Sequence, residues 1–323
     1  MKETRFISPL AERFNEFLNV KLALGYKYES GVNLLKRLDK LCAEFPDGCH
    51  SFSKGIVLAW IEKRPMETST TQQKRIKIAE EFASFLIRCG DSAYVLPPHK
   101  NNHQRSFVPY VFTHEQIEKF FNTVDIQSPH RAYPICNTMY SVLFRILYCC
   151  GLRISEALNL QYEDIDLVQG VLLVKKSKFF KDRLVPMSAL LQAVVEKYIP
   201  TAKLHYPENR HLFPSRFSNE SIVARVVYSY FRKMLWQSGI SHGGKGRGPR
   251  LHDFRHTFSV HALQKWIAEG IDVYTALPVL STYLGHENIR TTQQYLRLTA
   301  EVYPEILAVA EAFSGEIIPE VAQ

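Results

Sequence analysis

The chain has 323 residues, which is long enough for two domains that each bury a hydrophobic core. Hydrophobic residues make up 46% and charged residues 22%, as in an ordinary globular protein. The net charge of +8 favours an acidic partner, of which nucleic acid is the most common. The start of the chain lacks the apolar run of a signal peptide, and the most apolar stretch, near residues 142–152, is too short to span a bilayer. We therefore exclude a secreted or membrane protein and expect a cytoplasmic one.

The six cysteines include no C-x-x-C pair, which indicates reduced thiols in a reducing compartment. Cys42, Cys49 and His50 could be considered as metal ligands, but we interpret the two cysteines as ordinary thiols. We expect neither a metal ion nor another cofactor.

Apolar residues recur at helical spacing in four segments near the N-terminus, over residues 5–25, 29–44, 53–63 and 69–89. The fourth segment has a core stripe formed by Ile76, Ile78, Phe82, Phe85 and Leu86. These segments predict a small helical domain over residues 1–95, with more Lys and Arg than Asp and Glu on its polar faces.

Residues 96–110 are polar, contain proline and lack periodicity, which indicates a linker between domains. A capping box at Thr113 and Gln116 then predicts the start of a helix. Residues 170–174 and 183–186 indicate two strands joined by a basic turn. The predicted fold is mainly α with a small β-hairpin or sheet, and residues 111–299 form the second domain. The glycine-rich run at residues 241–249 fits neither a dinucleotide nor a P-loop pattern.

Four motifs carry side chains that could take part in a chemical reaction. In Gly151-Leu-Arg153-Ile-Ser-Glu156, the arginine and the glutamate share one face of a helix, although an ordinary surface ion pair would have the same spacing. The turn after residue 174 holds Lys175, Lys176, Lys178, Lys181 and Arg183, and so many like charges repel one another unless they meet an anion or remain solvated.

The third motif is Leu251-His252-Asp-Phe-Arg255-His256, in which His252 and Arg255 are adjacent on one helical face. An imidazole beside a guanidinium can hold a phosphate from two sides. The alternative, in which His252 and His256 bind zinc, places Arg255 beside the cation and lacks the glutamate of H-E-x-x-H.

The fourth motif, Leu284-Gly285-His286, precedes Tyr295 by nine residues. Together the motifs supply two arginines, two histidines, a lysine and a tyrosine, which suffice for metal-free attack on a phosphodiester. Arginines neutralise charge on the non-bridging oxygens, a phenol provides the nucleophile, and a lysine can protonate the departing sugar oxygen.

The order G-L-R-x-S-E, basic hairpin, H-x-x-R, L-G-H and Tyr resembles the tyrosine recombinase (phage integrase) family over residues 113–298. The resemblance implies that Arg153, His252, Arg255 and His286 surround the scissile phosphate and that Tyr295 is the nucleophile. It implies a supporting role for Glu156 and makes Lys178 the general acid when the turn is aligned from Pro186. Alignment from Gly170 selects the neighbourhood of Lys176 instead.

The resemblance also implies a transesterification that forms a 3′-phosphotyrosine bond, and strand exchange by four protomers through a Holliday junction. Residues 1–95 would then be the core-binding domain. The tail, residues 300–323, contains acidic residues but no Lys or Arg. We expect it to form an amphipathic helix that docks on a neighbouring protomer, or that folds back on its own domain. No separate arm-binding domain is expected.

Double-stranded DNA is the expected partner, contacted by basic and polar residues of both domains. The candidates are Tyr28, Asn33, Lys36, Lys74, Arg75, Lys77, Lys175, Lys176, Lys181, Arg183, Lys245 and Arg247. Three alternatives remain open at this stage: a type IB topoisomerase, a DNA-binding regulator of the same fold without catalysis, and a zinc hydrolase.

Overall fold

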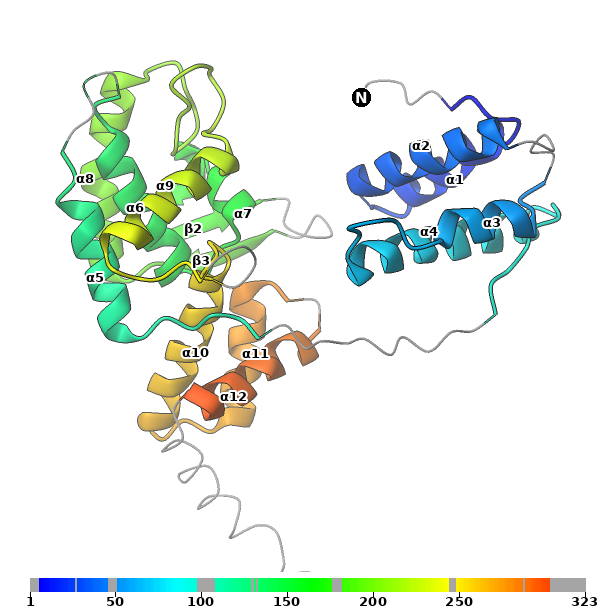
Figure 1. The fold of residues 1–323 in the computed structure, drawn as a ribbon. Coiled ribbons are helices and arrows are strands. Elements are labelled where there is room, and N and C mark those ends of the chain that lie inside the picture. The colour runs from blue at the N-terminus through cyan, green and yellow to red at the C-terminus, as the bar shows by residue number, and fades with distance from the viewer. Residues whose placement is uncertain are drawn as a thin grey trace, which may run out of the picture. The chain divides into compact units, whose positions relative to one another are not determined.

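The computed structural model divides into two compact units, residues 1–107 and 108–323. It describes residues 6–26, 28–45, 51–97, 108–128, 131, 133–175, 182–243, 248–286 and 288–302. The first unit is drawn in blue and cyan in Figure 1 and the second in green to orange.

The described part of unit 1 contains four helices, which confirms the four predicted helical segments. These are α1 (Ala11–Ala23), α2 (Glu29–Glu44), α3 (Lys54–Ile61) and α4 (Ser69–Arg88). The rings of Phe14 and Phe82 stack at the centre with centroids 4.2 Å apart, and Phe17 meets Phe82 edge-on. All five residues of the predicted core stripe of α4 are buried. Burial of these large rings contributes to the hydrophobic stabilisation of this small unit.

The described part of unit 2 is mostly helical and contains one small sheet. Its helices are α5 (His114–Asp125), α6 (Cys136–Cys149), α7 (Ile154–Leu158), the 3-10 turn η1 (Tyr162–Asp164), α8 (Ala189–His205), α9 (Ala224–Gln237), α10 (Asp253–Ala268), α11 (Val273–Leu284) and α12 (Arg290–Val302). Thr113 caps α5 as predicted: its side chain accepts from the Gln116 amide, and the Gln116 side chain accepts from the Thr113 amide. The prediction of a mainly α fold with a small sheet is therefore confirmed.

The sheet is antiparallel, in the order β1 (Ile165–Asp166), β2 (Val171–Val174) and β3 (Arg183–Pro186). Leu172 pairs with Val185 and Val174 with Arg183, so the predicted hairpin is confirmed. The short strand β1 was not predicted, because a two-residue strand has no recognisable periodicity. The turn between β2 and β3, with the predicted Lys176, Lys178 and Lys181, lies outside the described residues.

Two hydrophobic clusters share α10. The first includes four buried rings, Phe120, Phe144, Phe231 and Phe254, contributed by α5, α6, α9 and α10. The second joins α10 to α11 and α12 through residues such as Val260, Leu280 and Leu284. Helix α10 is thus packed on both sides, and this packing fixes the start of the helix, where the third motif lies.

Among the described residues, no helix is both long enough and apolar enough to cross a membrane. The predicted linker, residues 96–110, lies largely outside the described part of the chain, as do Lys245, Arg247 and the tail beyond residue 302.

Gly151 offers a test of how tightly unit 2 is packed around the first motif. Its φ is +59°, and an added Cβ would lie 2.6 Å from Cδ1 of Phe258 and 2.9 Å from Cδ2 of Leu284. We expect Gly151→Ala to lower the free energy of unfolding by the left-handed backbone cost of about 1–2 kcal/mol plus about 1–3 kcal/mol for the overpacked contact. Urea denaturation of the whole protein measures both effects.

Gly239→Ala is the matched control, since Gly239 has φ +73° and nothing within 4 Å of an added Cβ. It should show the backbone cost alone. Equal losses in the two variants would contradict the close packing at Gly151.

Candidate active site

The first motif places Arg153 and Glu156 around the start of α7. Arg153 precedes the helix, its backbone N–H donates to Oε2 of Glu156 at 3.0 Å, and its Nη1 donates to Oε1 at 2.6 Å. The predicted contact between these two side chains is therefore present. The carboxylate is buried, whereas the Arg153 side chain is partly exposed.

Arg183 holds the other side of the same carboxylate. Its Nη1 and Nη2 donate to the two Glu156 oxygens at 3.1 and 2.9 Å, and its Nε donates to the Tyr283 carbonyl at 3.0 Å. Burial alone would raise the pKa of Glu156, but the hydrogen bonds and charges of Arg183 and then Arg153 lower it to about 2. The carboxylate is thus ionised and joins β3 to α7, while Arg183 joins β3 to α11.

Arg255, in the first turn of α10, is only 1% exposed. Its Nη1 donates to the Gly151 carbonyl and its Nη2 to the Leu284 carbonyl, both at 2.7 Å. These bonds fix the guanidinium between the first and the fourth motif. Burial, and then the charge of Arg153, lowers its pKa to about 10, which still leaves it protonated at neutral pH.

The two predicted histidines lie in the same positive environment. Burial and the charges of Arg255 and Arg153 lower the pKa of His252 to about 4 and that of His286 to about 3. Both rings are therefore neutral at physiological pH. His286 Nδ1 lies 2.8 Å from Oγ1 of Thr292, a contact between the loop before α12 and the helix itself.

Tyr295 lies on α12 and is 1% exposed. Its ring stacks on His286, with centroids 6.1 Å apart and planes 19° apart. Burial raises the pKa of the phenol, whereas the Arg255 charge acts in the opposite direction. The charge of Arg255 acts on Arg153, His252, His286 and Tyr295. The structure therefore brings together these five residues, which are all the predicted catalytic residues except Lys178.

His256 was considered in the sequence only as a zinc ligand. In the structure its Nδ1 lies 3.0 Å from the Tyr295 hydroxyl, and its ring meets that of His252 edge-on. The described residues contain no group of three or more His, Cys, Asp or Glu side chains that could hold a metal ion. The sequence offered one signal for His256, its position one turn after His252 on the same helix.

The sequence of the catalytic unit matches a known family. The model of the phage integrase family covers residues 110–301, which is more than half of the chain. The chain belongs to the phage integrase family. This confirms the resemblance drawn from the motifs, and with it the enzyme class, a DNA strand transferase.

Two relatives illustrate the breadth of the match within the phage integrase family. The putative integrase/recombinase y4rB of Sinorhizobium fredii is 29% identical over 93% of this chain and 96% of its own length. The tyrosine recombinase XerA of Pyrococcus horikoshii is 28% identical over 63% of this chain and 62% of its own length.

Solved structures share the fold. A post-cleavage complex of the XerH site-specific recombinase with difH DNA has a TM-score of 0.64 at 17% identity, covering 87% of this chain and 80% of that one. The Tn1549 transposon integrase in complex with transposon right-end DNA has a TM-score of 0.60 at 15% identity, covering 92% and 99%.

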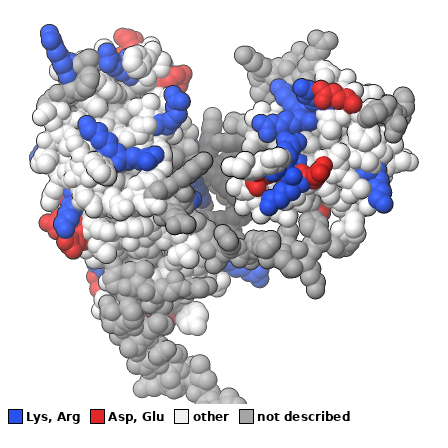
Figure 2. All heavy atoms as spheres, viewed as in Figure 1, with Lys and Arg blue, Asp and Glu red and all other residues white. Residues whose placement is uncertain are grey.

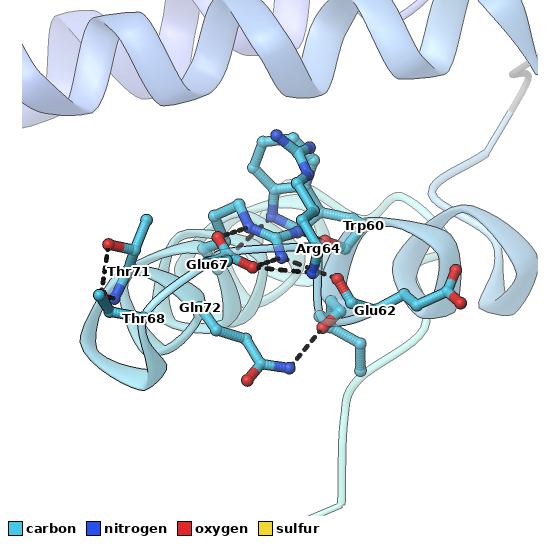
Figure 3. A network of polar contacts seen from close by, with 9 residues as sticks. Trp60, Glu62, Arg64, Glu67, Thr68, Thr71 and Gln72 are labelled. Atoms are coloured by element: carbon cyan, nitrogen blue, oxygen red, sulfur yellow. Dashed lines mark hydrogen bonds and ion pairs between the residues drawn. The ribbon is translucent and has the colours of Figure 1, made fainter.

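Arg75 corrects one of the predicted DNA contacts. Its side chain is 1% exposed and lies against Trp60. Its Nε donates to Oε1 of Glu67 at 2.8 Å, and its Nη atoms donate to the carbonyls of Trp60 and Glu62. Figure 3 shows this network, to which the segment between α3 and α4 contributes Glu62 and Glu67. Arg75 therefore connects α4 to the end of α3 and to the loop that follows it, and its side chain is not available to DNA.

Two cations of the hairpin are also engaged within the protein. Arg183 is held by both Glu156 oxygens, as described above, and its side chain is only 10% exposed, which corrects its prediction as a DNA contact. Lys175 pairs with Asp164 at 2.6 Å and with Glu163 at 2.8 Å, although its side chain remains 41% exposed. Lys176, Lys178 and Lys181 lie outside the described residues.

Several candidates in unit 1 do face solvent. Asn33, Lys36, Lys74 and Lys77 are exposed, whereas Tyr28 is partly buried against Phe17. Figure 2 shows Lys and Arg side chains gathered on the face of unit 1 turned to the viewer. The exposed members stay candidates for phosphate contacts.

The pH dependence of stability tests the Glu156 ion pairs. Because the folded pKa is below the ordinary 4.5, the pairs stabilise the fold fully above pH 4.5 and lose that effect as pH falls toward 2. We expect Glu156→Gln to be less stable than wild type by roughly 3 kcal/mol at neutral pH. The deficit should shrink between pH 4.5 and pH 2 in urea denaturation, and a deficit that stays constant there would contradict the assignment.

Lys74 and its neighbour Arg75 should behave oppositely. Lys74→Ala should weaken duplex DNA binding and reduce the slope of log affinity against log salt by about 1, with unchanged thermal stability. Arg75→Ala leaves Glu67 buried without its partner and should lower the free energy of unfolding by about 3–5 kcal/mol. Fluorescence anisotropy over a salt series, together with thermal melting, measures both, and an unchanged salt slope for Lys74→Ala would remove that residue from the interface.

Proposed function

We propose that this enzyme is a site-specific DNA recombinase in which Tyr295 attacks a phosphodiester and becomes covalently linked to the DNA. The observation that carries the proposal is the position of the Tyr295 phenol next to His286 and under the charge of Arg255, which also acts on Arg153 and His252. A nucleophile and two guanidinium groups in one place fit attack on an anionic phosphorus centre.

Each group has a defined part in the reaction. Arg153 and Arg255 neutralise the non-bridging oxygens, and the neutral His252 and His286 hydrogen-bond to the phosphate. The bond from the Tyr295 oxygen to phosphorus forms as the phenol O–H bond breaks, and the phenol proton passes to a neutral imidazole of the site. The bond from phosphorus to the 5′ oxygen breaks at the same time, and Lys178 gives that oxygen its proton. The products are a 3′-phosphotyrosine and a free 5′-hydroxyl.

Strand exchange reverses this chemistry on a second strand. The free 5′-hydroxyl attacks the phosphotyrosine of a partner strand, so that the energy of the broken bond is kept in the covalent link. Neither ATP nor a divalent metal ion is needed. Four protomers on two DNA sites would perform two such exchanges through a Holliday junction, with residues 1–95 and 111–299 gripping the duplex and the tail, residues 300–323, docking on a neighbour.

Positive charge around the site supports this assignment. Glu156 supplies one negative charge beside the guanidinium groups of Arg153 and Arg183, and both Nη atoms of Arg255 donate to carbonyls. Such a site attracts a phosphate. The similarity to y4rB, a putative integrase/recombinase, over nearly the whole chain supports recombination as the outcome.

A nicked suicide substrate tests the nucleophile. Wild type should form an SDS-stable, protease-sensitive adduct with DNA that carries a nick beside the cleavage site, with or without EDTA, and Tyr295→Phe should form none. Tyr274→Phe is the matched control, because Tyr274 is 86% exposed at the start of α11 and should leave the adduct intact. The target can be taken from the sequences that flank the gene.

Two outcomes would contradict the proposal. An adduct in Tyr295→Phe would show that another residue is the nucleophile. DNA binding by wild type without any adduct would favour a regulator that shares the fold without the chemistry.

A further inference from the structure

A second histidine of the third motif touches the reactive oxygen. His256 lies on α10, one turn after His252, and its side chain is buried. Nδ1 of His256 is 3.0 Å from the Tyr295 hydroxyl, and the two ring centroids are 5.6 Å apart. The contact joins α10 to α12, two helices that also share a hydrophobic cluster.

The direction of this hydrogen bond follows from the groups around the phenol. Burial raises the pKa of Tyr295, so the hydroxyl keeps its proton at neutral pH. The charge of Arg255 lowers that pKa, and side-chain hydrogen bonds with Ser259, Gln294 and Arg255 lower it further. A guanidinium can only donate, so the Arg255 bond occupies a lone pair of the phenol oxygen, and the phenol proton can be donated to Nδ1 of His256, which is within reach.

His256 is in the state that accepting requires. Burial, and then the charges of His252 and Arg255, lowers its pKa to about 3, so the ring is neutral at physiological pH. A neutral ring with its proton on Nε2 presents a free lone pair at Nδ1. The groups that act on it come from α10 itself and, through Tyr295, from α12.

We propose that His256 positions the nucleophile by accepting a hydrogen bond from the Tyr295 hydroxyl at its Nδ1. The bond fixes the rotation of the phenol O–H and turns the oxygen lone pairs toward Arg255, where the phosphate is expected. This inference rests on the proposed function, because it takes Tyr295 as the nucleophile. A misplacement of about 1 Å at a reacting atom can cost about 100-fold in rate, so a single fixed hydrogen bond at this oxygen matters.

Three substitutions at His256 separate the acceptor from the bulk of the ring. Asn places its carbonyl oxygen near the position of Nδ1, Gln places its amide near Nε2, and Leu removes the acceptor. At saturating enzyme, the single-turnover cleavage rate of a suicide substrate should fall about 100-fold in His256→Leu and His256→Gln, and stay within about tenfold of wild type in His256→Asn. The affinity for the same DNA should change by less than about twofold in all three.

His261 provides a matched control on the same helix. It is also buried, and its Nδ1 also lies 3.0 Å from a tyrosine hydroxyl, that of Tyr148. His261→Leu should lower thermal stability as His256→Leu does, but should cleave at the wild-type rate. A general loss of stability therefore cannot imitate the expected result.

The outcomes distinguish the inference from the proposed function. Wild-type cleavage by His256→Leu, with an adduct that still depends on Tyr295, would overturn the role of His256 and leave the proposed function in place. An equally slow His256→Asn would overturn the acceptor role. An adduct in Tyr295→Phe would overturn both proposals.

A measurement on the free protein does not depend on cleavage. With ¹³Cζ-labelled tyrosine, the Tyr295 signal among the sixteen tyrosines is the one that disappears in Tyr295→Phe. The signal should shift in His256→Leu, return toward its wild-type position in His256→Asn, and stay in place in His261→Leu. A Tyr295 signal that is unchanged in His256→Leu would overturn the inference.

Discussion

The site depends on keeping three guanidinium groups close together in a largely buried place. Like charges at low dielectric repel strongly, and each needs a partner or a carbonyl to offset its lost hydration. Glu156 satisfies Arg153 and Arg183 at once, and the Gly151 and Leu284 carbonyls satisfy Arg255. These few bonds join α7, β3, α10 and the end of α11. The residues that offset these charges therefore also assemble the site from segments far apart in the sequence.

Burial, reinforced by the surplus positive charge, explains the state of the other groups. The histidines stay neutral because the arginines and burial both disfavour the imidazolium form. Neutral rings can act as hydrogen-bond partners without adding to the repulsion. Helix α10 can carry this arrangement because it is packed on both sides: Phe254 enters the aromatic cluster, while its neighbour Arg255 donates to the Gly151 and Leu284 carbonyls. Hydrophobic packing thus fixes the first turn of α10 although the positive charges near it are not fully balanced.

Much of the fold and the site could be predicted because their signals are local. Helical periodicity located α1 to α4, and spaced motifs identified Arg153, His252, Arg255, His286 and Tyr295 as one group. The errors concern two cations, Arg75 and Arg183, which were predicted as DNA contacts but pair with carboxylates inside the protein. Arg75 falls on the core stripe of α4, one turn before Ala79 and two turns before Phe82, so its burial was readable from periodicity. Arg183 shares a strand face with the buried Val185, so the two-residue alternation of β3 places its side chain on the inward face. Both were treated as surface residues because their charge outweighed their position.

His256 could not be recognised in the same way, because its role depends on an atom of another helix. Helix α10 is buried on almost every side in its first turns, so burial alone does not mark one histidine among the residues around it. What distinguishes His256 is the Tyr295 hydroxyl, thirty-nine residues further along the chain. An arriving phosphate would offset the charge of Arg255, which now helps to lower the pKa of His256. The negative charge of the DNA would thereby make Nδ1 of His256 a stronger acceptor at the moment when the Tyr295 hydroxyl must lose its proton.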